Sequence, residues 1–66
     1  MKNRLKIERA IQNLTQDDLS KLTNVSRQTI NSIESGRYVP STVLALKISK
    51  VFEKPVNEIF ELEDSD

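Results

Sequence analysis

The stretch QDDLSKLTNVSRQTINSIESG, residues 16–36, decides the fold of this 66-residue chain. Thr15, directly before the stretch, and Ser26, near its middle, are residue types that favour the start of a helix because their hydroxyls accept hydrogen bonds from free backbone N–H groups. Gly36 suits the left-handed residue that follows a helix end. Only residues 23–25 separate the two helices that these signals predict. Two short helices joined by so tight a turn are typical of a helix-turn-helix.

The side chains of this stretch fit such a motif, which spans about residues 16–35. We predict helices over residues 16–22 and 27–35, with the small Ser20 at their close approach and Asn24 in the turn, where asparagine tolerates a positive φ. The apolar residues whose spacing locks the two helices together are Leu19, Val25, Ile30 and Ile33. Leu19 and Leu22 form the predicted buried face of the first helix.

Helical signals continue on both sides of the motif. The further predicted elements are a helix over about 3–12, a helix over 42–52 capped by Ser41, and a short last helix that begins near Pro55 and contains Phe60. A fraying acidic tail follows over 61–66, and its first three residues are compatible with extended structure. In the first of these, Ile7 and Ile11 lie on the predicted apolar stripe, with Leu14 one turn beyond. No convincing strand-and-turn alternation occurs. We therefore predict an all-α fold of five helices in a single domain.

The composition restricts the function. The chain has no cysteine and no histidine, which excludes disulfides, thiolate nucleophiles, imidazole bases and the usual zinc sites. So short a chain could hardly also form a pocket that buries a substrate. No apolar run approaches the ~20 residues that span a bilayer, and the N-terminus has no signal-peptide pattern. We expect no enzyme activity, no metal, no cofactor, and a location in the cytoplasm rather than a membrane.

The formal net charge is zero, but the charges are unevenly distributed. Residues 1–38 carry seven basic and four acidic side chains, whereas residues 39–66 carry three basic and six acidic ones. This polarity suits a protein that turns one face toward phosphates and its acidic end away. Ordinary solvated surfaces are the alternative interpretation.

The motif residues permit a closer comparison. The stretch resembles the pattern of Cro/C1-type (XRE-family) DNA-binding regulators of bacteria and phages. The matching residues are Gln16, Leu19, Ser20, the run NVSRQTIN at 24–31, Ile33, Glu34 and Gly36. The resemblance continues through Arg9, residues 14–16, Tyr38, Pro40, Ser41, residues 44–48 and residues 58–60. The chain departs from the usual pattern at Glu8, Ser20, Asn24 and Val39. The resemblance implies a compact five-helix, lambda-repressor-like fold in which the second and third helices form the helix-turn-helix.

The resemblance also implies a function. It favours a transcriptional regulator of bacterial or phage origin, more often a repressor, that binds a palindromic double-stranded DNA operator on the nucleoid as a homodimer. A protein co-regulator is a further partner that it leaves open. The rival interpretation is an antitoxin-like or other protein-interaction module with the same fold. A polar face on the second motif helix favours DNA, and an apolar face would favour a protein.

In helix-turn-helix proteins bound to DNA, the N-terminal half of the second motif helix enters the major groove. The predicted base contacts are Arg27, Gln28, Asn31 and Ser32, and the predicted phosphate contacts are Gln16, Ser26, Thr29, Arg37 and Tyr38. Arginine bonds guanine bidentately, and glutamine bonds adenine in the same way. The alternatives are a plain solvated helix face, a first-turn role for Gln16 that only favours the helix, and packing of the Tyr38 ring over the loop.

Two further sets of residues have predicted roles. Arg9 and Glu34 resemble an ion pair of the family that ties the first helix to the end of the third. The predicted dimer interface consists of Val56, Ile59, Phe60 and Leu62, because the single-domain members of the family favour a dimer through the last helix and the C-terminal segment. The alternative places these apolar side chains in the core of the monomer.

Overall fold

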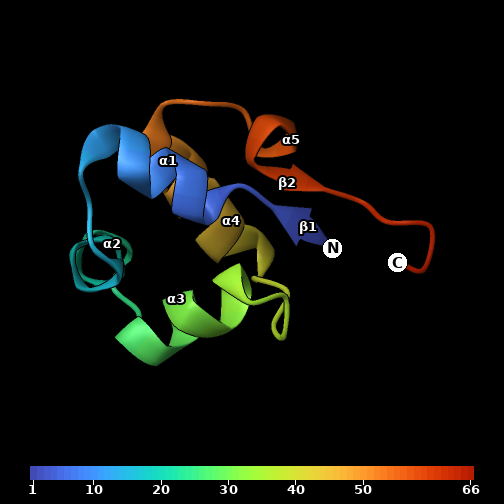
Figure 1. The fold of residues 1–66 in the computed structure, drawn as a ribbon, viewed down its shortest axis with the longest axis horizontal. Helices are drawn as coiled ribbons and strands as arrows, with labels where there is room; N and C mark the ends of the chain where they lie inside the picture. Colours follow the sequence, from blue (N-terminus) through green and yellow to red (C-terminus); the bar gives the residue numbers. More distant parts are fainter.

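The computed structural model describes all 66 residues and contains five helices and one two-stranded sheet. The elements are β1 (Lys2–Asn3), α1 (Leu5–Gln12), α2 (Gln16–Thr23), α3 (Arg27–Glu34), α4 (Thr42–Phe52), α5 (Val56–Ile59) and β2 (Phe60–Glu61). Figure 1 shows them along the chain, with β1 and β2 side by side. The prediction of five helices is confirmed. No helix has the length and apolar character that crossing a membrane requires.

The small sheet was not predicted. It pairs the two ends of the chain antiparallel, with Lys2 opposite Glu61 and Asn3 opposite Phe60. The first helix therefore begins at Leu5 rather than Asn3, and Phe60 leaves the predicted last helix for β2. A pair of two-residue strands leaves no periodic pattern in a sequence, because alternation needs about four residues to be recognised.

The predicted N-terminal caps are confirmed. The hydroxyls of Thr15, Ser26 and Ser41 accept hydrogen bonds from backbone N–H groups in the first turns of α2, α3 and α4. At Thr15 the arrangement is reciprocal, because the Asp18 carboxylate accepts the N–H of Thr15 at 2.9 Å. Such capping boxes satisfy two backbone donors that would otherwise lack partners.

Helices α1 to α4 end in the same hydrogen-bonded turn. Two N–H groups beyond the helix bond to carbonyls of its last turn, as in the bond of Val25 N to Ser20 O at 3.0 Å, and the turn requires a left-handed residue. The residues in that conformation are Asn13, Asn24, Gly36 and Glu53, with φ between 53° and 80°. The positive φ of Asn24 and the helix-ending role of Gly36 are therefore confirmed.

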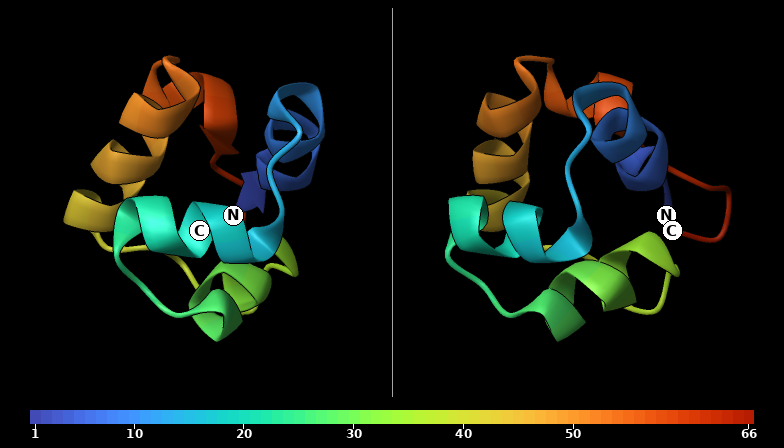
Figure 2. Two further views of the ribbon diagram at one scale, coloured as in Figure 1. Left: turned by 90° about the vertical axis from the view of Figure 1, so that its left-hand side faces the viewer. Right: turned by 60° about the vertical axis from the view of Figure 1, so that its left-hand side comes forward.

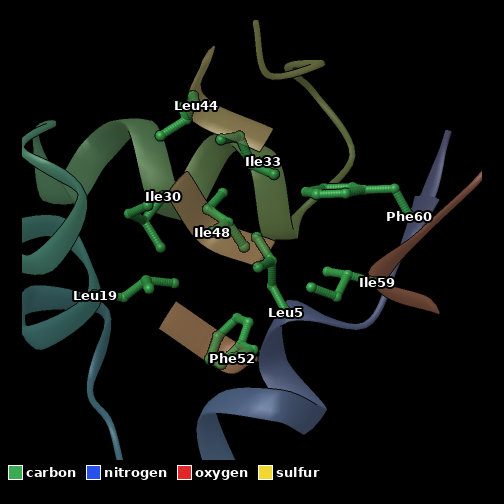
Figure 3. Close-up of a cluster of buried hydrophobic side chains, with 9 residues drawn as sticks. All are labelled: Leu5, Leu19, Ile30, Ile33, Leu44, Ile48, Phe52, Ile59 and Phe60. Carbon is green, nitrogen blue, oxygen red and sulfur yellow. The ribbon is translucent and has the colours of Figure 1, made fainter. Parts of the chain in front are cut away.

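One cluster of nine buried apolar side chains joins the elements. All five helices and β2 contribute to it, as Figure 3 shows: Leu5, Leu19, Ile30, Ile33, Leu44, Ile48, Phe52, Ile59 and Phe60. Figure 2 shows α2 and α3 together at one end of the molecule, with α1, α4 and α5 above them. The outer side of α3 is thus left at the surface.

Two sequence predictions about packing are wrong. Leu22 is 59% exposed, although it was assigned to the buried face of α2, and Ile7 and Ile11 are exposed on α1. Helix α1 instead buries Leu5 and Glu8. The buried Glu8 carboxylate has a cationic partner, because its Oε2 lies 3.0 Å from the Nζ of Lys54 in the loop after α4. A buried carboxylate must face such a partner.

Candidate nucleic-acid interface

Helix α3 is fixed by its two apolar residues and leaves its polar residues outside. Ile30 and Ile33 are buried in the core. The opposite side of the helix exposes Arg27, Gln28 and Asn31. Since side chains three and four positions apart share one face of a helix, Gln28 and Asn31 lie together on this outer face.

The predicted DNA-contacting residues form one continuous surface. A shallow hollow on one side of α3 is lined by Ser26, Gln28, Thr29, Ser32, Arg37 and Tyr38. A second hollow is lined by Gln16, Arg27, Gln28 and Asn31. Gln28 belongs to both hollows, which are therefore adjacent. Together they contain all nine side chains that the sequence predicted as base or phosphate contacts.

Several donors on this surface have no partner within the protein. The side chains of Arg27 and Gln28 take part in no hydrogen bond or ion pair, and Asn31 uses only its Oδ1 atom. Arg37 donates from Nε to the Ser35 hydroxyl at 3.0 Å, and its terminal nitrogens are free. Free guanidinium and amide groups are the donors that recognise base edges and phosphates.

The start of α3 carries two linked hydroxyls. Ser26 Oγ accepts the backbone N–H of Thr29 at 3.1 Å, and the two hydroxyl oxygens lie 2.8 Å apart. One hydroxyl donates to the other, so one hydroxyl hydrogen remains for an outside acceptor. This geometry suits a phosphate oxygen at the edge of the hollow that contains Tyr38, whose ring is half exposed.

Gln16 is engaged more fully than the sequence indicated. Its Nε2 donates to Glu34 Oε2 at 2.9 Å and to Asn31 Oδ1 at 3.2 Å. Both amide hydrogens are therefore used inside the protein. The backbone N–H of Gln16, at the start of α2, has no acceptor in the protein. The predicted phosphate contact of this residue consequently depends on its backbone, where the helix dipole favours an anion.

Arg9 and Glu34 form an ion pair between α1 and the end of α3. Arg9 donates from Nη2 to Glu34 Oε2 at 3.1 Å and from Nε to Oε1, and its Nη1 bonds the Leu14 carbonyl at 2.8 Å. The hydrogen bond to Glu34 raises the pKa of Arg9. Burial acts to raise the pKa of Glu34, but hydrogen bonds from Arg9 and Gln16 outweigh it and hold that pKa below its ordinary value.

This arrangement of helices is shared with known proteins. A family model described as helix-turn-helix, of the Cro/C1 type, matches residues 5–59. The chain belongs to this family.

Two relatives and one solved structure show how far the likeness extends. An uncharacterized HTH-type transcriptional regulator of Methanocaldococcus jannaschii is 54% identical over 66 residues, which is the whole of both chains. The uncharacterized HTH-type transcriptional regulator YgzD of Bacillus subtilis is 45% identical over 64 residues, 97% of each chain. The restriction-modification controller protein C.AhdI from Aeromonas hydrophila matches with a TM-score of 0.79 and 28% identity over 86% of each chain.

The relatives are transcriptional regulators rather than enzymes. As a helix-turn-helix protein, this chain is likewise a DNA-binding regulator of transcription.

In this family member, the residues predicted for a dimer interface lie in different environments. Ile59 and Phe60 are buried in the core, where they contact the other core side chains rather than solvent (Figure 3). Their side chains therefore offer no surface to a second copy. Val56 is half-buried against the core, and Leu62 is 78% exposed. The interface prediction depends on these last two residues.

Asn3 is a positioning residue that the sequence did not reveal. Its Nδ2 donates to the Ile33 carbonyl at 2.8 Å, and its Oδ1 accepts the backbone N–H of Leu5 at 3.1 Å. Asn3 thereby holds the end of α3 and the start of α1 together. An asparagine two residues before a helix is a cap signal, but its second partner lies 30 residues away.

Proposed function

We propose that this regulator binds a specific sequence of duplex DNA by inserting α3 into the major groove, and that it represses transcription. One observation carries the proposal: all nine predicted contact side chains lie on one surface around α3, where Arg27 and Gln28 have no partner within the protein. The surface is polar, which favours DNA over the protein partner of an antitoxin-like module. The family resemblance favours repression over activation.

A single motif of this size reads only a few base pairs, so a regulator normally needs two half-sites to compete with genomic DNA. We therefore propose a homodimer on a palindromic operator, with recognition helices one DNA turn apart, roughly 34 Å. Leu62 supports this proposal, because this exposed leucine directly follows β2 and is suited to contact a second copy.

Selection of bound sequences from a random duplex pool tests the proposal. Arg27→Ala and Gln28→Ala should each cost about 1–3 kcal/mol and relax one or two base positions. Arg37→Ala is the matched control, since it removes an arginine at the edge of the same surface and should weaken binding to all sequences about equally. Unchanged preferences in both α3 variants would show that α3 does not read the DNA.

Salt and transcription provide two further measurements. The logarithm of affinity should fall linearly with the logarithm of salt, by about 0.9 for each neutralised phosphate. A flat response would exclude DNA as the main ligand. Transcription from a promoter that carries the selected site should fall when the protein is added, whereas a rise would identify an activator.

The dimer has its own test. Leu62→Lys should lower operator affinity through loss of the second half-site and leave the helical content unchanged. Leu22→Lys is the matched control, because Leu22 is an exposed leucine on a different element, α2. Sedimentation at micromolar concentration should show a dimer for the parent and the control. A parent monomer that binds a non-repeated site would exclude the dimer.

A further inference from the structure

A chain of four side chains connects α1 with the outer face of α3. Arg9 donates to both carboxylate oxygens of Glu34, and Gln16 Nε2 donates to Glu34 Oε2 at 2.9 Å. The same Gln16 nitrogen donates to Asn31 Oδ1 at 3.2 Å. The Arg9 and Glu34 side chains toward one end are 15% and 9% exposed, whereas Asn31 at the other end is open to solvent.

The charges fix the direction of every hydrogen bond in this chain. A carboxylate paired with an arginine only accepts hydrogen bonds, so the nitrogen of the Gln16 amide, not its oxygen, must face Glu34. The second hydrogen of that nitrogen is then directed to Asn31, which must offer its oxygen. Asn31 Nδ2 is left on the other side of the amide, with no acceptor in the protein.

We infer that Gln16 sets the base preference of Asn31, because it holds Oδ1 toward α2 and leaves Nδ2 to face the major groove. This inference rests on the proposed entry of α3 into that groove. An amide nitrogen donates two hydrogens, and guanine presents two adjacent acceptors, N7 and O6. Asparagine reads adenine with its oxygen and nitrogen together, and here Gln16 already engages the oxygen. The base pair that Asn31 reaches should therefore carry guanine.

The alternative role for Gln16 has a different signature. A residue that only contacts phosphate positions the protein without reading sequence. Its loss weakens binding to all duplexes alike. A positioning residue that acts through Asn31 changes the preference at one base position and leaves the other positions unchanged.

Sequence selection from a random duplex pool separates the two roles. Asn31→Ala should remove the guanine preference at one position and so identify it. Gln16→Met retains the length of the side chain without its donor, and the freed Asn31 amide can then rotate to read adenine. The guanine preference over adenine at that position should fall by about 5- to 150-fold, the equivalent of one base contact. The positions that Gln28→Ala relaxes should be unchanged in Gln16→Met.

Asn31→Asp is a second variant that keeps the Gln16 contact. One carboxylate oxygen accepts from Gln16, and the other presents an acceptor to the groove, so the preference should change from guanine to cytosine, whose N4 is a donor. This variant decides the matter if Gln16→Met fails to fold, as judged by circular dichroism.

Several outcomes overturn the inference without affecting the proposed function. In Gln16→Met, such an outcome is unchanged base preferences with an equal loss of affinity for all sequences. In the parent, it is selection of adenine at the position that Asn31 contacts. In the Asn31 variants, it is unchanged base preferences in Asn31→Ala, or no change from guanine to cytosine in Asn31→Asp. A parent that selects no sequence at all would instead remove the proposed function.

Discussion

Replacing Lys54 by methionine is expected to lower the free energy of unfolding by about 2 kcal/mol. Lys54 Nζ lies 3.0 Å from Glu8 Oε2, and the Glu8 side chain is only 2% exposed. Methionine retains most of the aliphatic length of lysine but not the charge. The carboxylate of Glu8 would then remain buried without its nearest cation.

The magnitude follows from the geometry. Two unit charges 3.0 Å apart attract by about 5.5 kcal/mol at an effective dielectric constant of 20, and by about 1.4 kcal/mol in bulk water. The Lys54 side chain is 41% exposed, so solvent screening brings the attraction toward the lower value. Arg4 Nε lies 3.8 Å from Glu8 Oε2 and would still compensate part of the Glu8 charge in the variant. About 2 kcal/mol corresponds to a fall of about 8–16 °C in Tm for a domain of this size.

Urea unfolding followed by circular dichroism measures the change, since the chain has no tryptophan. Lys47→Met is the matched control, because Lys47 is an exposed lysine of α4 without an ion pair and should change stability by less than about 0.5 kcal/mol. Glu8→Met provides the second background. An apolar residue of similar volume in place of a buried ion often leaves stability unchanged or improved, so Lys54→Met should cost little once Glu8 is absent.

The reasoning fails if Lys54→Met destabilises the Glu8→Met background as much as it destabilises the parent. Such a result would assign the effect of Lys54 to the packing of its side chain rather than to its charge. A loss below about 0.5 kcal/mol in the parent would refute the reasoning as well, because it would mean that Arg4 alone compensates Glu8.

Three further predictions concern stability. Glu53→Gly should raise the free energy of unfolding by about 0.5–1 kcal/mol, because Glu53 has a φ of 53°, which is unfavourable for a residue with a Cβ. Asn24→Gly should raise it by less. A lower free energy of unfolding for Glu53→Gly, measured in urea, would contradict the argument. Thr15→Ala should cost about 1 kcal/mol through loss of the capping box, and Thr42→Ala, just after the cap of α4, should cost much less. The lowered pKa of Glu34 means that its ionised form stabilises the fold at pH values above the ordinary glutamate pKa. This stabilisation should be lost as the pH falls through the pKa of Glu34 in the folded protein. In Glu34→Gln, the urea midpoint should therefore fall less on acidification than in the parent.

The local parts of the fold were predictable because their causes are local. The cap hydroxyls of Thr15, Ser26 and Ser41 and the left-handed turn at Asn24 each act within a few residues of sequence. Glu53 was missed although it occupies the same kind of turn as Asn24. Glutamate carries no turn signal, and the packing of α4 and α5 imposes its conformation.

The orientation of α1 was not predictable, because its cause is distant in sequence. Ile7, Ile11 and Leu14 have the spacing of a buried stripe, yet the first two are exposed. Helical periodicity identifies a helix but not which of two apolar faces is buried. The buried face carries Leu5, which packs in the core, and Glu8, whose partner Lys54 lies 46 residues further along the chain. The pairing of β1 with β2, which buries Phe60, is non-local in the same way.

The candidate interface combines both kinds of cause. The outward residues of α3 were predictable, because the positions of Ile30 and Ile33 determine which side of the helix is free. Two supports of α3 come from the N-terminal segment, where Asn3 bonds the Ile33 carbonyl and Arg9 pairs with Glu34. Both supports act on the C-terminal half of the helix. The N-terminal half is held by the cap at its start and by the core.

This division has a consequence for recognition. A DNA-recognition surface discriminates best between sequences when the residues that support it are rigid before binding, because binding then costs less conformational entropy. The buried isoleucines Ile30 and Ile33 and the charge-assisted hydrogen bonds of Glu34 hold α3 in place, and they involve no donor of Arg27 or Gln28. Among Arg27, Gln28 and Asn31, only the Asn31 side chain is hydrogen-bonded within the protein, to Gln16. In the proposed complex, Arg27 and Gln28 can therefore adjust to the DNA backbone and base edges, whereas Asn31 presents one fixed atom. Of these three residues, Asn31 should tolerate a substitution of the base pair it contacts least.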